Sequence, residues 1–90
     1  MAKKAEPIIT YTEILALAGK EIHGEIIKLR TEAAEMREKA KTPEQQDLIA
    51  DFIKMGKERE QYHMRRLEAI ETMYLIQTGA NLGIIEELQE

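Results

Sequence analysis

The chain has 90 residues, which is enough for one small domain or half of one. Only 4% of the residues are aromatic and none is cysteine. This composition argues against a β-sandwich or barrel and excludes disulfides, thiolate zinc sites and cysteine nucleophiles. The net charge is −4 with acids and bases interleaved, so we expect neither a nucleic-acid nor a membrane partner. With no signal-peptide pattern and no apolar run long enough to span a bilayer, the sequence predicts a cytoplasmic protein.

The first long helix is predicted at about residues 8–40. Residues 1–7 are polar and end in Pro7, which predicts a flexible N-terminal arm. Thr10 or Thr12 is suited to cap the helix, and Glu13 completes a capping box with Thr10. Apolar residues then recur in steps of three and four, as on one helix face. They are Ile8, Tyr11, Leu15, Ala18, Ile22, Leu29 and Met36.

The second long helix is predicted at 43–78. Thr42 is suited to be the N-cap, Pro43 the first helical residue, and Gln45 the partner in a capping box. Gly79 is typical of the residue that ends a helix, and the tail 79–90 has room for a short helix after Asn81. The face of this helix consists of Ile49, Ile53, Gly56, Glu60, His63, Leu67, Ile70 and Tyr74.

These elements predict an all-α fold. A connection of two or three residues makes the two helices antiparallel. Two helices enclose no core by themselves, because each apolar stripe stays half exposed to water. We therefore expect the hairpin to dimerise into a four-helix bundle, or to build a higher symmetric oligomer.

A few polar residues interrupt these apolar faces: Glu25 and Glu32 on the first helix, and Glu60 and His63 on the second. An unpaired buried carboxylate is costly, so it neutralises, pairs or binds a metal. Glu25 lies 17 residues before Thr42 and Glu60 lies 18 residues after it, which predicts the same level in an antiparallel hairpin. His63 is one turn from Glu60. All three are near the midpoints of their helices, where a two-fold axis would bring two trios together.

Four carboxylates and two imidazoles in an apolar core suit iron, two ions per dimer, or manganese. The alternative is a buried polar network that links Glu25, Glu60 and His63 to Arg59 or Arg66 and fixes the register of the bundle. A non-enzymatic hairpin adaptor would follow from that reading. Glu32 is interpreted as an edge residue, with Ala33 in the seam.

The segment Glu60-Gln61-Tyr62-His63 has the Glu-x-x-His form found in the ferritin-like superfamily. With Glu25 in the place of the first-helix carboxylate, residues 10–78 resemble the half-ferritin hairpin of the encapsulated ferritins. The resemblance implies that Glu25, Glu60 and His63 are the metal-binding and catalytic residues. It also implies ferroxidase activity, that is, oxidation of Fe(II) with O₂ for iron storage or detoxification.

The tail from Gly79 to Ile85 is similar to the small and aliphatic tails that load cargo into encapsulin shells. That similarity implies an encapsulin-type shell as a partner and a location inside a protein nanocompartment. A short helix that docks on a neighbouring subunit is the alternative explanation of the same residues.

Overall fold

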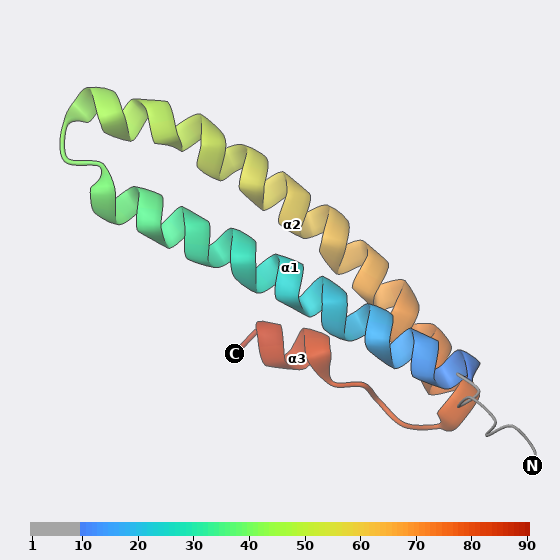
Figure 1. The fold of residues 1–90 in the computed structure, drawn as a ribbon. Coiled ribbons are helices and arrows are strands. Elements are labelled where there is room, and N and C mark those ends of the chain that lie inside the picture. Colours follow the sequence, from blue (N-terminus) through green and yellow to red (C-terminus); the bar gives the residue numbers. More distant parts are fainter. Residues whose placement is uncertain (1–9) are drawn as a thin grey trace, which may run out of the picture.

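The computed structural model describes residues 10–90, which form three helices (Figure 1). They are α1 (Tyr11–Lys39), α2 (Pro43–Thr78) and α3 (Ile84–Leu88). The predicted pair of long helices and the short C-terminal helix are thereby confirmed. The predicted flexible arm at 1–7 and the predicted start of the first helix at residue 8 lie outside the described residues.

Capping side chains fix the ends of the two long helices. The Thr10 hydroxyl accepts a hydrogen bond from the Glu13 N–H, and the Thr42 hydroxyl accepts one from the Gln45 N–H. The Gln45 side chain accepts in return from the Thr42 N–H, which completes the capping box. Gly79 ends α2 with a φ of 76°, a left-handed conformation that glycine adopts without the cost of a Cβ. Short-range chemistry thus sets the length of the hairpin.

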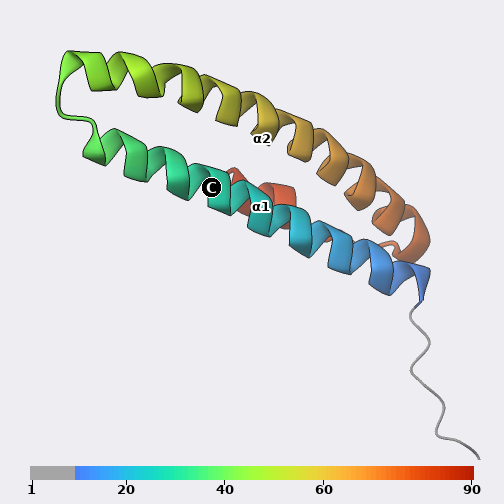
Figure 2. The same cartoon turned by 45° about the horizontal axis from the view of Figure 1, so that its top comes forward.

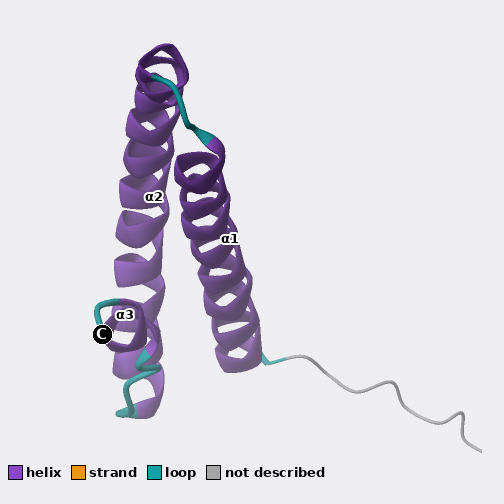
Figure 3. Cartoon of the chain, turned by 90° about the vertical axis from the view of Figure 1, so that its left-hand side faces the viewer, coloured by secondary structure: helices purple, strands orange, loops and turns teal. Residues whose placement is uncertain are grey.

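The chain folds back after α2, so that α3 lies against one side of the hairpin (Figures 1 and 2). Viewed from the end of the hairpin near the turn in Figure 3, α3 lies on one side of the helix pair, and it contacts both α1 and α2. We call the side that α3 occupies the covered face. The tail therefore docks on its own chain, and its docking on a neighbouring subunit stays a prediction.

All three helices contribute to a small hydrophobic core on the covered face. It contains Ile22 and Ile26 of α1, Leu67 of α2 and Leu88 of α3. Ile26 and Leu67 have no exposed surface. Gly19 permits the close approach, because a Cβ there would lie 3.1 Å from Cδ1 of Ile84. The core thus depends on the tail as much as on the hairpin.

The predicted face of the first helix needs a correction in its middle. The prediction continued from Ile22 to Glu25 and Glu32, but Ile26 is buried and both glutamates are exposed. The buried face of α1 therefore continues from Ile22 to Ile26, four residues later, because α2 and α3 together bury Ile26. Ala33, half-buried, lies in the seam beside the exposed Glu32, as interpreted.

A second apolar row runs along α2 and is exposed. Its members follow one another in steps of four and three, and the row lies about 100° around the helix from the seam with α1. Two arginines and one alanine hold the intervening positions. The row is Leu48, Phe52, Met55, Arg59, Tyr62, Arg66, Ala69, Met73 and Ile76.

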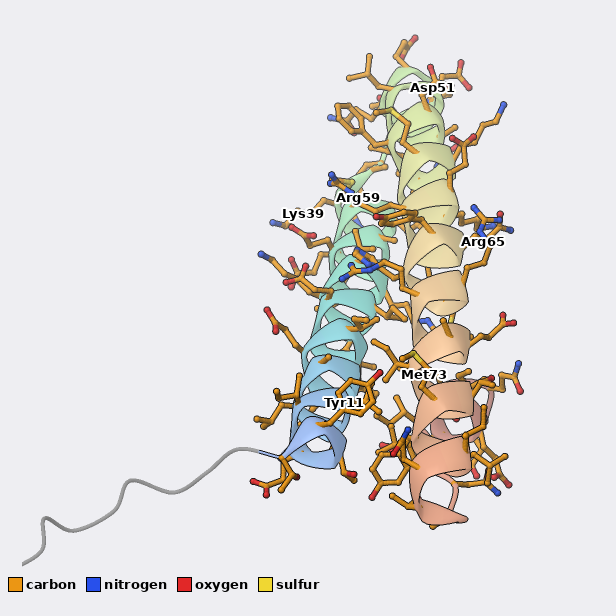
Figure 4. All side chains as sticks on the ribbon, turned by 90° about the vertical axis from the view of Figure 1, so that its right-hand side faces the viewer. Tyr11, Lys39, Asp51, Arg59, Arg65 and Met73 are labelled. Carbon is orange, nitrogen blue, oxygen red and sulfur yellow. The ribbon has the colours of Figure 1, made fainter. Side chains whose placement is uncertain are left out.

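This row belongs to the side of the hairpin opposite α3, which we call the open face. The Tyr11 hydroxyl of α1 lies 3.8 Å from Sδ of Met73, so α1 contributes to the same side (Figure 4). Nearer the turn, a groove between the two helices is lined by Met36 and Arg30 of α1 and Phe52 of α2, and by no residue of α3. Phe52, Met55 and Tyr62 are all more than half exposed.

No helix within residues 10–90 has the length and apolarity needed to cross a membrane.

Candidate functional site

Glu25 and His63 border the same groove on the open face. Glu25 extends from the exposed flank of α1, while His63 is half-buried on α2. The antiparallel pairing of the helices brings Glu25 and His63 to one groove, whereas the prediction placed Glu25 level with Glu60. The other residues that line the groove are Lys28, Leu29, Glu32, Arg59 and Tyr62.

Glu60 has a different neighbour. Its Oε1 lies 2.7 Å from Nε of Arg30, and the two side chains form an ion pair in which Glu60 is 25% exposed and Arg30 42% exposed. Nη1 of Arg30 also donates to the backbone carbonyl of Leu88 in α3, at 2.8 Å. Glu60 is therefore held toward the covered face and does not line the groove of Glu25 and His63.

His63 lies among aromatic and cationic groups. Its Nδ1 is 3.4 Å from Nη1 of Arg66, and its ring centroid is 5.6 Å from that of Tyr62. The Arg66 guanidinium lies over the Tyr62 ring at 5.6 Å. A guanidinium only donates hydrogen bonds, so its contact favours a His63 ring in which Nδ1 accepts the bond and Nε2 carries the proton. A metal at Nε2 would require the other tautomer.

One chain alone does not assemble the predicted metal site. Within residues 10–90, no three His, Asp or Glu side chains are close enough together to hold a metal ion. The donor types fit iron or manganese, since carboxylate oxygen and imidazole nitrogen are ligands of both. Glu25 and His63 line the same groove, and Glu60 pairs with Arg30 away from it. The predicted assembly of six ligands from two chains stays a prediction.

The predicted alternative, a buried polar network around Glu25, Glu60 and His63, is not formed within residues 10–90, where no polar side chain is buried and where Glu60 and His63 make separate contacts. The cation that pairs with Glu60 is Arg30, where Arg59 or Arg66 was expected. Arg30 was missed because it lies 12 residues before Thr42 and Glu60 lies 18 after it, so a search for side chains at one level does not pair them. A signal was present, because Arg30 directly follows the seam residue Leu29, and arginine reaches several residues along a helix.

Comparison with known proteins yields no match to any protein-family model, curated protein or solved structure. The resemblance to the encapsulated ferritins stays a prediction that rests on Glu25, Glu60 and His63.

Proposed function

We propose that two copies of the chain pair through their open faces and bind iron between them. In this proposal Glu25, Glu60 and His63 of each copy are the ligands, and the site oxidises Fe(II) with O₂ as a ferritin-like ferroxidase. The observation that carries the proposal is the position of Glu25 and His63. They share a polar groove near the middle of the open face, between the exposed apolar side chains toward the two ends of the α2 row, and nothing in the described chain covers it.

The spacing of the apolar row supports a helical partner on the open face. Alternating steps of four and three along α2 are the pattern that packs one helix against another. The row extends from Leu48 to Ile76 with Tyr62 at its midpoint. A two-fold axis near Tyr62 would therefore align the row with its own copy in antiparallel fashion, over its full length.

Charge on the open face supports a second copy of this chain as the partner. The flank of α1 that borders the groove carries Glu25, Glu32 and Lys28 and is negative overall, whereas the row on α2 carries Arg59 and Arg66. Pairing by a two-fold axis would bring the acidic flank of each copy toward the basic row of the other. Such complementarity favours one register and opposes the reversed one.

The chemistry of the groove suits Fe(II). Two copies would supply carboxylates that bridge two ions, together with one imidazole for each ion. Two Fe(II) would each lose one electron to one O₂, which would take up two protons and leave as hydrogen peroxide. For Glu60 to take part, its carboxylate must turn from Arg30 toward His63, one helical turn away on the same side of α2.

A second candidate function is a non-enzymatic adaptor, which the ion pair of Glu60 with Arg30 favours. Because Glu60 has a cationic partner within its own chain, it needs no metal to offset its partial burial. In an adaptor the open faces would still pair, and the polar residues would set the register. The two functions differ in whether the dimer binds iron.

An anaerobic titration of the purified protein with Fe(II), followed by exposure to air, tests the proposal. We expect saturation near one iron per chain and rapid formation of Fe(III), monitored by absorbance. Glu25→Gln, Glu60→Gln and His63→Ala should each abolish tight binding. Glu58→Gln, which removes an exposed carboxylate of the same helix outside the proposed ligand set, should leave it unchanged. A dimer that binds no iron would refute the iron site and favour the adaptor.

A further inference from the structure

One side chain, that of Arg30, connects all three helices. It extends from α1, pairs with Glu60 of α2 at 2.7 Å and donates to the carbonyl of Leu88 in α3 at 2.8 Å. A planar guanidinium is suited to this task, because it directs several N–H groups outward at fixed angles. Arg30 is thus placed to respond to both α2 and α3.

Arg30 contacts the C-terminal end of α3, where backbone carbonyls lack hydrogen-bond partners within the helix. Leu88 is the last residue of α3, and the final carbonyls of a helix have no partner within it. A cation near a helix C-terminus also interacts favourably with the helix dipole. The side chain of Leu88 is buried in the core, so Arg30 secures the residue that anchors the tail.

Two further polar contacts hold α3, and neither involves a proposed ligand. Glu71 of α2 accepts a hydrogen bond from the Ile85 N–H at 2.8 Å, and His23 of α1 lies 3.7 Å from Glu87. Arg30 is therefore the one described side chain that joins the docking of α3 to a residue of the proposed iron site.

We propose that Arg30 couples the docking of α3 to the availability of Glu60 for metal. While α3 is docked, Arg30 holds the Glu60 carboxylate toward the covered face. Metal that recruits Glu60 to the open face removes one of the two acceptors that fix Arg30 and so loosens α3. This inference rests on the proposed function, because it takes Glu60 to be a ligand. Arg30 would be a positioning residue, which touches a ligand and not the metal.

Coupling of this kind is reciprocal. If α3 docking lowers the affinity for iron, then iron must lower the stability of docked α3 by the same factor. Because Arg30 is 42% exposed, water screens its charge, and an ordinary intramolecular hydrogen bond sets the scale at about two- to tenfold. Iron binding at the open face would then weaken the docking of α3 on the covered face, and the tail would become more accessible to solvent.

Anaerobic Fe(II) titration of the full chain, combined with hydrogen exchange of the α3 amides, tests the coupling. Arg30→Gln should bind iron about two- to tenfold more tightly and exchange its α3 amides faster by a similar factor. Arg30→Lys keeps a charge for Glu60 but not the two-sided geometry, so its affinity should stay near that of the unaltered chain while α3 exchange still increases. Arg65→Gln, an exposed change on α2 (Figure 4), should alter neither.

The outcomes separate this inference from the proposed function. Equal or weaker iron binding by Arg30→Gln, with the unaltered chain still binding, would overturn the coupling and leave the iron site standing. If Arg30→Gln binds iron and the unaltered chain does not, the coupling would be supported and the iron site in the unaltered protein would be refuted. Absence of binding by both chains would overturn both.

Discussion

The two faces of the hairpin carry similar apolar side chains, which are buried on the covered face and exposed on the open face. On the covered face, Ile26 and Leu67 are fully buried beneath the tail. On the open face, Leu48 is 69% and Phe52 56% exposed, although their row along α2 is as regular as the seam. The difference is a covering element, since Leu88 of α3, with Ile84 and Ile85 packed beside it, completes the core on one side only.

This comparison indicates how a two-helix chain solves the problem of an incomplete core. A pair of helices buries one stripe of each helix and leaves both flanks exposed to water. This chain uses its own tail for one flank. We infer that it uses a second copy for the other, where the iron ligands are predicted. The predictions below test whether the two faces differ in this way.

The largest expected effect comes from Leu67→Ala on the covered face. Removal of a fully buried leucine side chain should lower the free energy of unfolding by about 2–5 kcal/mol. The change would be measured by urea denaturation followed by circular dichroism, at one protein concentration because association contributes to stability.

Leu48→Ala is the matched control for that prediction, because it removes the same atoms from the open face near the turn. In the monomer its cost should be small, since the side chain is already exposed. Equal losses in the two variants at low protein concentration would contradict the distinction between the faces.

A smaller effect is expected from Phe52→Glu, which places a charge in the apolar row of the open face. The dissociation constant of the dimer should rise by at least about tenfold, since an aromatic contact is lost and a carboxylate must be desolvated. Sedimentation equilibrium over a range of concentrations would measure it. Helix content and unfolding of the monomer should remain close to those of the unaltered chain.

Leu17→Glu is the control for association, because Leu17 is exposed to a similar degree but lies near the tail, in a groove with Leu82 and Ile84. Its dimer should be unaffected. If Leu17→Glu disrupts association and Phe52→Glu does not, then the partner binds on the side of α3 and the proposed site is on the wrong face.

Much of the fold follows from local sequence signals. Thr42, Pro43 and Gly79 determine the ends of α2, because capping and backbone preference depend only on near neighbours. The half-buried seam of α2 is also visible in its periodicity. The middle of α1 was mispredicted, since the choice between Glu25 and Ile26 depends on α3, which is distant in sequence. Periodicity alone does not reveal such a cover.

The candidate site was only partly predictable for the same reason. Glu25 and His63 share a groove because helical spacing determines their level and flank. The partner of Glu60 was not predictable, because Arg30 reaches it diagonally and is itself oriented by the carbonyl of Leu88. A long flexible side chain can contact a residue that helical spacing alone does not predict as its neighbour.

The smallest expected effects distinguish two glycines of α1. Gly24→Ala should raise the free energy of unfolding by about 0.5–1 kcal/mol, because alanine favours helix and nothing lies within 4 Å of the added Cβ. Gly19→Ala has the same helical advantage, but its Cβ would meet Ile84 at 3.1 Å, so Ile84 or the tail must shift. We therefore expect a smaller gain or a loss, together with faster hydrogen exchange in α3. Equal gains in stability from the two variants would mean that the tail is not packed tightly on Gly19, and the contrast between the covered and open faces would weaken accordingly.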